Sequence, residues 1–354
     1  MYNYIVKEDL KYITDADLPW NLFENSTVLI SGANGFLPSY MVHTLIYLNE
    51  KYNKNIKILA LVRNKKKAEK RFKDYIDRND FKLIVQDVCK PIKIDMDTDL
   101  DFIIHAASQA SPKYYGIDPI GTFNANVKGT NNLIKLAYEK KSKSFLFFSS
   151  SEIYGEISKN QIPTKESDYG YLDPLNVRSC YAEGKRAGET ICICWQYKYN
   201  IPIKIARPFH IYGPGMDLND GRVFADFARN IVNNKNIVLN SDGSATRSFC
   251  YIADAIIGFF TILLKGEAGQ SYNVGFNKET SILELAEILV NLFPEKNLKV
   301  IKKEDQFNKG YIKSKITRSC PDILKIKKLG WIPQFSIQEG FKRTNSFYEK
   351  STFN

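Results

Sequence analysis

The amino-acid sequence predicts an α/β fold, in which a doubly wound parallel sheet is followed by a smaller C-terminal α/β lobe. Short apolar runs alternate with longer amphipathic segments from residue 27 onward, as in repeated strand–helix units. After about residue 208, loops rich in Gly, Pro, Asn and Asp separate the remaining helical patterns. We therefore expect an N-terminal extension over 1–26, a sheet domain mainly over 27–207 and a smaller lobe mainly over 208–354.

Six apolar runs are expected to form the buried strands of the sheet. Their apolar residues are continuous, which is typical of parallel strands that are covered on both faces. The runs cover 27–31, 56–62, 81–86, 101–107, 144–150 and 201–207. Helical patterns lie between them at 38–50, 120–140 and 179–199. Residues 1–26 precede the first strand, and we expect them to pack on the surface.

Composition excludes several classes of protein. The 354 residues carry a net charge of +11, but the lysines are scattered and "RNKKKAEKR" is the one dense run, which favours small anionic ligands over nucleic acid. Six cysteines without CxxC spacing and only three histidines argue against a metal site or disulfides and for a reducing cytoplasm. Neither a signal peptide nor an apolar run of membrane-spanning length is visible, so we expect no membrane partner.

The segment "ISGANGFLPSYM" follows the first strand and opens the first helix. Gly32 allows a tight turn, and Gly35 lets the backbone approach a pyrophosphate at the helix N-terminus. Pro38 stands where a third glycine is usual, and we expect it to push helix and strand slightly apart. This segment predicts a dinucleotide site that also includes Asn34, Phe36 and Leu37.

The end of the second strand normally selects the cofactor. An acidic residue there binds the adenosine ribose of NAD, whereas an arginine pairs with the 2′-phosphate of NADP. This strand ends in Arg63 without a carboxylate. Arg63 therefore either reads that phosphate or begins a lysine-rich helix in solvent, and both interpretations stay open.

The third and fourth strands end in further candidates. Asp87, beside Val88, either binds the adenine amino group or is a loop acid in solvent. Ala106 and Ala107 are small enough to leave room for a cofactor, and Ser108 follows them. His105 points from the strand end and is expected to be packed rather than catalytic.

The segment "SCYAEGKRAGET" places a phenol and an ammonium group four residues apart. Tyr181 and Lys185 lie about one helical turn apart and therefore share a face. Ser150, Ser151 and Glu152 end the fifth strand, at the edge where parallel sheets bind ligands. The cofactor motif upstream favours Tyr181 as a base whose pKa a neighbouring cation lowers, over a solvated surface pair.

These motifs together resemble the extended short-chain dehydrogenase/reductase family, the NAD-dependent epimerases and dehydratases of nucleotide sugars. Further segments, including "NDGRVFADF", "ATRSFCYI" and "CPDILKIKKLGWIP", are similar to its UDP-glucuronate decarboxylase branch. The resemblance implies a Rossmann-type domain that binds dinucleotide and a C-terminal lobe that binds nucleotide sugar. It also implies a triad of Ser150, Tyr181 and Lys185 with Glu152 beside it.

The resemblance assigns further site residues. Arg247 would reach the reacting end of the sugar, and Arg222 would contact the nucleotide or its phosphates. Further cofactor contacts would come from Asn126, Ser149, Pro208 and His210, and substrate contacts from Ser111, Ser151, Glu152 and His210.

The sequence also departs from the decarboxylase pattern. Pro38 and Arg63 replace a usual glycine and aspartate, while His210 and Gly215 replace an asparagine and an arginine. The nucleotide and the sugar therefore stay open, and a 4,6-dehydratase or a 4-epimerase is the alternative; Ser151 counts only against dehydratases of the dTDP-glucose type. A plain dehydrogenase and a non-catalytic NAD(P)-sensing protein are remoter interpretations.

The resemblance also implies which cofactor the enzyme uses and which oligomer it forms. We expect NAD+, or NADP+ because of Arg63, to be held tightly and recycled. We expect a cytoplasmic homodimer of polysaccharide biosynthesis that pairs through 120–140 and 180–198. The second of these helices carries Ile191, Ile193 and Trp195, which could instead face the sheet.

Overall fold

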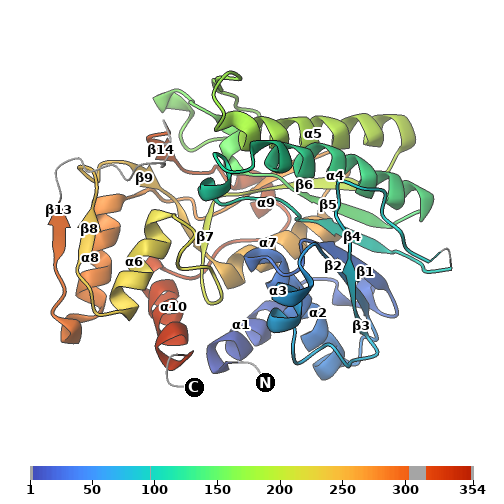
Figure 1. Ribbon diagram of the computed structural model, residues 1–354, viewed down its shortest axis with the longest axis horizontal. Helices are drawn as coiled ribbons and strands as arrows, with labels where there is room; N and C mark the ends of the chain where they lie inside the picture. Colours follow the sequence, from blue (N-terminus) through green and yellow to red (C-terminus); the bar gives the residue numbers. More distant parts are fainter. Residues whose placement is uncertain (1–2, 96, 303–315, 352–354) are drawn as a thin grey trace.

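A seven-stranded parallel sheet lies at the centre of the molecule (Figure 1). The computed structural model describes residues 3–95, 97–302 and 316–351. The strand order is β11-β6-β5-β4-β1-β2-β3, the order of a doubly wound sheet. The strands are β1 (Thr27–Ser31), β2 (Lys57–Val62), β3 (Phe81–Val85), β4 (Phe102–His105), β5 (Ser144–Phe148), β6 (Ile203–Pro208) and β11 (Ser271–Val274). All six expected strands are confirmed.

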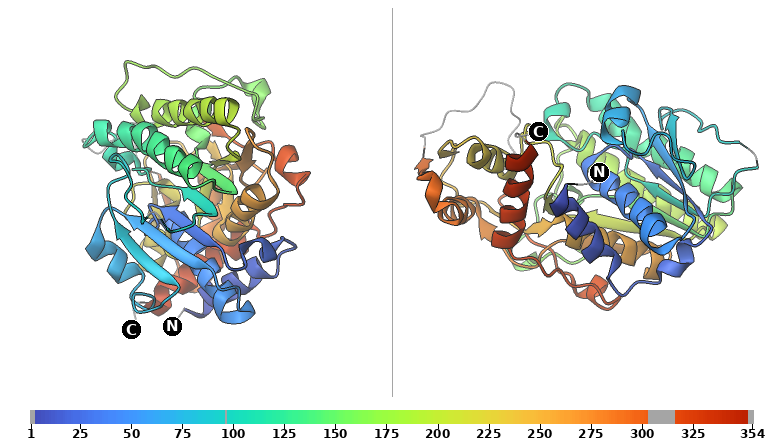
Figure 2. Two further views of the ribbon diagram at one scale, coloured as in Figure 1. Left: turned by 90° about the vertical axis from the view of Figure 1, so that its right-hand side faces the viewer. Right: turned by 90° about the horizontal axis from the view of Figure 1, so that it is seen from below.

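Helices cover both faces of this sheet because each strand alternates its side chains between them. Val28 and Ile30 of β1 face the core that includes α2 (Phe36–Tyr52), α3 (Lys65–Arg71) and α7 (Ile252–Lys265). Leu29 faces the core on the side of α4 (Pro119–Glu139) and α5 (Ser179–Tyr199). The helices α4 and α5 lie side by side along one outer face (Figures 1 and 2). The three expected helices are thereby confirmed.

A smaller lobe stands at the carboxyl edge of the sheet, on the left in Figure 1. Its helices are α6 (Val223–Val232), α8 (Ile282–Leu292) and α10 (Ile337–Ser351), whereas the short helix α9 (Leu324–Lys327) packs against β11 and α7 beside the sheet. Its strand pairs and ribbons are β7 (His210–Tyr212) with β10 (Phe249–Tyr251), β8 (Ile237–Leu239) with β13 (Val300–Lys302), and β9 (Thr246–Arg247) between β12 (Thr280–Ser281) and β14 (Arg318–Ser319).

The chain does not divide simply at residue 208. After β10 it returns to the sheet, where α7 packs against β5 and β6, and β11 extends the sheet beyond β6. Strand β11 was not predicted from the sequence, because a four-residue strand has little periodicity of its own.

The N-terminal segment was expected on the surface, and the structure corrects this. Helix α1 (Tyr4–Thr14) begins at Asn3, whose side chain accepts a hydrogen bond from the Ile5 amide at 3.0 Å. Leu10 and Ile13 of α1 and Phe23 of η1 (Trp20–Phe23) are fully buried in the same apolar core as the sheet. The segment therefore contributes to the main core rather than lying on it.

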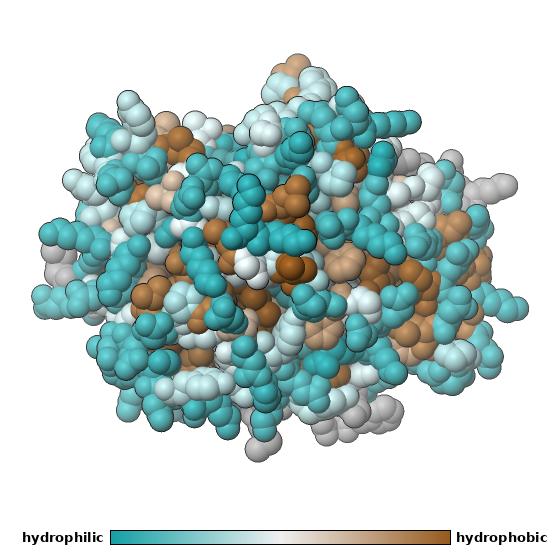
Figure 3. Space-filling model, turned by 180° about the vertical axis from the view of Figure 1, so that it is seen from behind, coloured by the Kyte–Doolittle hydropathy of each residue, from teal (hydrophilic) through white to brown (hydrophobic). Residues whose placement is uncertain are grey.

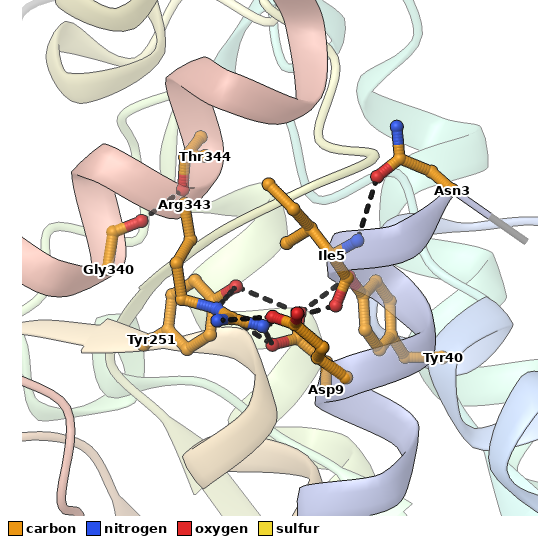
Figure 4. Close-up of polar contacts among 9 residues, drawn as sticks. Asn3, Ile5, Asp9, Tyr40, Tyr251, Gly340, Arg343 and Thr344 are labelled. Atoms are coloured by element: carbon orange, nitrogen blue, oxygen red, sulfur yellow. Dashed lines mark hydrogen bonds and ion pairs between the residues drawn. The ribbon is translucent and has the colours of Figure 1, made fainter. Parts of the chain in front are cut away.

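A buried carboxylate joins the two ends of the chain (Figure 4). Asp9 of α1 accepts hydrogen bonds from the hydroxyl of Tyr251 at 2.8 Å and from Nη2 of Arg343 in α10 at 2.8 Å. The hydroxyl of Tyr40 in α2 lies at 3.3 Å. Burial raises the pKa of Asp9 to about 6, although Arg343 and the two phenols oppose the shift.

Hydrophilic residues cover much of the face that Figure 3 shows, and apolar residues gather on it in scattered patches. Within the described ranges, we find no helix with the length and apolar character needed to cross a bilayer.

Candidate active site

A cleft of about 1100 Å³ lies between the carboxyl ends of the sheet strands and the smaller lobe. Loops that follow β1, β2, β3, β4, β5 and β6 all reach it, because parallel strands point their carboxyl ends to one edge. The residues predicted from the sequence that line it are Gly32, Asn34, Gly35, Phe36, Leu37, Arg63, Asp87, Val88, Ala106, Ala107, Ser108, Ser111, Ser149, Ser150, Ser151, Glu152, Tyr181, Lys185, Pro208, His210, Arg222 and Arg247.

Asn126 is the one assigned residue that does not line the cleft. It is fully buried in α4, where its Nδ2 donates to the carbonyl of Thr122 at 2.9 Å. Its neighbour across the helix pair is Gly184 of α5, where a Cβ would come within 3.4 Å of the Asn126 side chain. A role for Asn126 toward a cofactor would therefore be indirect.

The glycine loop has the geometry that a pyrophosphate site needs. Gly32 has a φ of +64°, and a Cβ there would lie 2.7 Å from the Cα of Ala107. Gly35 directly precedes α2, and Pro38 is buried in the first turn of that helix.

Three buried polar atoms of the cleft lining have no hydrogen-bond partner within the described ranges. They are Ser108 Oγ, Ser149 Oγ and His210 Nδ1. Buried polar atoms are normally satisfied, so these three fit a polar ligand that lies along the sheet edge. Together with the glycine loop, they show that the residues present suit a dinucleotide.

Tyr181 and Lys185 share one face of α5, as expected, but burial sets their protonation. The Ser150 hydroxyl hydrogen bonds the phenol of Tyr181 and lowers its pKa, yet burial outweighs this and raises the pKa to about 12. Lys185 donates to the carbonyl of Phe148 at 2.5 Å, and burial lowers its pKa to about 7. In the free protein, desolvation thus favours the neutral form of both groups, and a Tyr181 pKa lowered by the Lys185 cation stays a prediction for the site with its ligands bound.

Glu152 has a partner that the sequence analysis missed. Arg178, at the start of α5, donates from Nη2 to both carboxylate oxygens of Glu152, at 3.1 and 3.3 Å. Its guanidinium carbon also lies 5.4 Å from the ring centroid of Tyr115, and the Tyr115 ring stacks on Tyr181 at 5.1 Å. An arginine three residues before the tyrosine, and thus about one helical turn away, was the available signal.

The smaller lobe brings three assigned residues to the cleft. Arg222 forms an ion pair with Asp220 through Nη2 and donates from Nε at 2.6 Å. The Arg247 guanidinium donates to the carbonyls of Thr246 at 2.7 Å and Ile316 at 2.8 Å. Burial and these two cations hold the pKa of His210 well below its usual range, so its imidazole is neutral.

Two further assigned residues are engaged within the protein. Asp87 accepts a hydrogen bond from the Cys89 amide at 2.9 Å. The hydroxyl of Ser111 donates to the carbonyl of Asp220 at 2.7 Å and so links the sheet edge to the smaller lobe. His105 is fully packed, with Nδ1 2.8 Å from the Ser31 hydroxyl and a pKa lowered by burial to about 3, as expected for a residue without a catalytic role.

The expected pairing helices carry an exposed aromatic cluster. Trp195 lies 4.9 Å from Tyr199 and 6.2 Å from Tyr138, between ring centroids, and its Nε1 donates to Asn131. Ile193 is 41% exposed, whereas Ile191 and Trp195 pack partly against the core under α4 and α5.

Comparisons with known proteins agree with this architecture. Residues 28–275 match the model of the NAD dependent epimerase/dehydratase family. UDP-glucuronic acid decarboxylase 5 of Arabidopsis thaliana is 33% identical over 318 residues, which are 89% of this chain and 87% of the relative. UDP-glucuronic acid decarboxylase 1 of Danio rerio is 30% identical over 329 residues, 92% of this chain and 73% of the relative.

Solved structures confirm the expected Rossmann-type fold. Epimerase Mth375 from Methanothermobacter thermautotrophicus superposes with a TM-score of 0.80 at 20% identity, covering 99% of this chain and 96% of that one. UDP-glucuronic acid 4-epimerase from Bacillus cereus, in complex with UDP-glucuronic acid and NAD, has a TM-score of 0.74 at 22% identity and covers 92% of this chain and 99% of its own.

Proposed function

The chain belongs to the NAD dependent epimerase/dehydratase family, and we propose that it decarboxylates UDP-glucuronate after oxidising carbon 4 of the sugar. The observation that carries this proposal is one cleft that brings together Ser150, Tyr181, Lys185 and Glu152. Long similarity to UDP-glucuronic acid decarboxylases, over 89% of the chain for the Arabidopsis relative, supports the choice of substrate.

A bound nicotinamide dinucleotide would supply the hydride acceptor for the oxidation at carbon 4. The Tyr181 phenol oxygen would take the proton of the 4-hydroxyl, and the Ser150 hydroxyl would donate to the developing ketone oxygen. Tyr181 can act as a base only after its raised pKa falls. The Lys185 ammonium nitrogen lies 5.9 Å from the ring centroid of Tyr181, so the charged form of Lys185 would lower the pKa of Tyr181.

Decarboxylation follows from the position of the ketone. A carboxylate at carbon 6 lies β to the carbon-4 carbonyl, so the bond between carbons 5 and 6 breaks and its electron pair becomes an enolate. Ser150 and Tyr181 suit stabilisation of that enolate oxygen. Glu152 suits proton delivery to carbon 5, because Arg178 holds its carboxylate beside the tyrosine pair. The products would be CO2 and either UDP-xylose or its 4-keto form.

The alternative function is that of a 4,6-dehydratase or a 4-epimerase, and two residues of the smaller lobe support this alternative. Neutral His210 and Gly215 stand where decarboxylases have an asparagine and an arginine, so the sugar pocket differs there. With a hydroxymethyl at carbon 6, the same oxidation acidifies the carbon-5 hydrogen, and Glu152 would act as the base in loss of water.

The assembly and compartment belong to the same proposal. We propose a homodimer through α4 and α5, supported by the aromatic cluster on those helices. We also propose that the protein works in a reducing cytoplasm and serves polysaccharide biosynthesis. The six free cysteines support the cytoplasmic location.

Mass spectrometry of the products tests the proposal. Purified protein is mixed with UDP-glucuronate and, separately, with neutral UDP-, dTDP-, GDP- and CDP-hexoses, with the Tyr181→Phe variant as the inactive control. Loss of the mass of CO2 from UDP-glucuronate, or of CO2 and two hydrogens if the 4-keto sugar is released, supports decarboxylation when the wild type alone shows it. Loss of the mass of water from a neutral hexose, with UDP-glucuronate unchanged, would overturn the decarboxylase proposal in favour of a dehydratase.

A further inference from the structure

Three cationic side chains line the cleft where β2 and α3 border it. Arg63 follows β2 directly, and Lys67 and Arg71 lie four residues apart on one face of α3. The remaining basic residues of α3, Lys65, Lys66 and Lys70, do not line the cleft. One face of the lysine-rich segment therefore borders the cleft, with Arg63 and Lys67 exposed at its mouth.

The charges at the mouth of this site form no ion pair with any residue that the structure describes. Within the described ranges, neither the Arg63 guanidinium nor the Lys67 ammonium makes a hydrogen bond or an ion pair. Lys67 is held in place through its backbone, whose amide donates to the side chain of Asn64 at 3.0 Å. Arg71 lies deeper and makes long contacts, to the carbonyl of Gly215 at 3.4 and 3.5 Å and to the hydroxyl of Ser39 at 3.5 Å.

The nearby carboxylates are engaged elsewhere. Asp87 accepts the Cys89 amide at 2.9 Å. Asp118 caps α4 and accepts from Gln109 at 2.8 Å; the charge of Arg63 contributes only weakly to lowering the pKa of its carboxyl. From Lys57 to Ala68 the chain has no acidic residue that could bind a ribose hydroxyl.

We propose that this end of the cleft binds a 2′-phosphate, so that the protein prefers NADP(H) to NAD(H). Arg63 would donate two parallel hydrogen bonds to the phosphate oxygens. Lys67 adds a point charge from the next helical turn, and Arg71 makes the electrostatic potential there more positive. The inference rests on the proposed nicotinamide site and specifies the cofactor that this site takes.

Calorimetric titration of the whole chain with NADP+, NAD+, 2′,5′-ADP and 5′-AMP tests it without any turnover. The wild type is expected to bind NADP+ at least about tenfold more tightly than NAD+, and 2′,5′-ADP more tightly than 5′-AMP. The advantage should shrink at high salt, because the added contacts are between charges at the cleft mouth.

Single substitutions test which residues cause the preference for NADP+. Arg63→Gln and Lys67→Gln should each weaken NADP+ by about 10- to 100-fold and NAD+ by less than about twofold. Lys66→Gln removes the same charge from the same helix outside the cleft, and should leave both affinities unchanged. Retained NAD+ binding also shows that each variant is folded.

The outcomes separate the two proposals. If the wild type binds NAD+ as tightly as NADP+, or if Arg63→Gln weakens both equally, the 2′-phosphate site is wrong while the nicotinamide site stands. If neither dinucleotide binds, the proposed function and this inference are both overturned.

Discussion

The Nη2 atom of Arg178 lies 3.1 Å from one carboxylate oxygen of Glu152 and 3.3 Å from the other. The arginine and glutamate side chains are only 13% and 30% exposed. Because Glu152 follows β5 while Arg178 lies at the start of α5, the pair joins the strand end to the helix that carries Tyr181. Arg178 is therefore a positioning residue for Glu152 in the proposed reaction.

Removal of Arg178 should impair the step at carbon 5. In Arg178→Gln the Glu152 carboxylate loses its charged partner and its fixed position, and kcat should fall on the order of 10²-fold. Arg178→Lys keeps the charge and should restore part of the loss. The measurement is kcat beside cofactor affinity, with Arg229→Gln as the control, since Arg229 pairs with Asp226 outside the cleft. Equal kcat in Arg178→Gln and wild type would contradict the positioning role.

Tyr181→Phe removes the proposed base, and turnover should fall by several orders of magnitude. Ser150→Ala should cost less, on the order of 10²-fold, because it removes one hydrogen bond to the developing ketone. The Ser150 hydroxyl also lowers the pKa of Tyr181. Its loss raises that pKa, and since the base acts when deprotonated, the acid limb of the kcat/KM profile should move to higher pH. Near-normal turnover of Tyr181→Phe would disprove the central assignment.

Lys185 should give a distinct dependence of stability on pH. Burial lowers its pKa from the ordinary 10.5 to about 7 in the folded protein, so between these values the unfolded chain binds the extra proton. Stability from this group therefore rises as pH rises from about 7 to about 10. Urea unfolding of wild type and Lys185→Met across that range should show the rise in the difference between them. A difference in unfolding free energy that stays constant with pH would contradict the lowered pKa of Lys185. Turnover of Lys185→Met should be severely reduced at every pH.

Arg343 should stabilise the fold most above pH 6. Burial raises the pKa of Asp9 from 3.8 to about 6, so the carboxylate is charged in the native state only above that pH, and the native state binds the extra proton between the two values. Arg343→Gln leaves this buried charge without its main counter-ion, and at pH 7.5 should cost on the order of 3 kcal/mol. At pH 5 the loss should be smaller, because Asp9 is then protonated.

Urea unfolding at the two pH values measures this difference. Lys11→Gln is the control, because Lys11 pairs with Asp15 in solvent on the same helix α1. A loss for Arg343→Gln that is equal at both pH values would contradict a role through the charge of Asp9.

The proposed dimer should depend on the exposed residues of α5. Tyr197 is 90% exposed and Ile193 41% exposed, beside the cluster of Trp195 and Tyr199. The double variant Ile193→Lys, Tyr197→Lys should shift a dimer to a monomer in light scattering at micromolar concentration. Leu324→Lys, on α9 and 62% exposed, is the control. A wild type that is monomeric under these conditions would refute the dimer.

Local pattern was enough to predict most of the framework and the position of the cleft. Strand periodicity, the glycine loop and the polar residues at strand ends are short-range features, and in a parallel sheet every carboxyl end meets one edge. That is why Gly32, Ser150 and Tyr181 could be assigned to one cleft without coordinates. Asn126 is the exception, because its side chain turns into the packing between α4 and α5.

Tertiary structure alone decided the partners and the protonation. Glu152 meets Arg178 across 26 positions and Asp9 meets Arg343 across 334, separations at which no periodicity constrains contact. The spacing of Tyr181 and Lys185 showed that they share a face, but the direction of their pKa shifts depends on how completely the fold excludes water. Sequence thus determined which groups reach the cleft, whereas burial and long-range packing determined their charge, because desolvation is a property of the assembled fold.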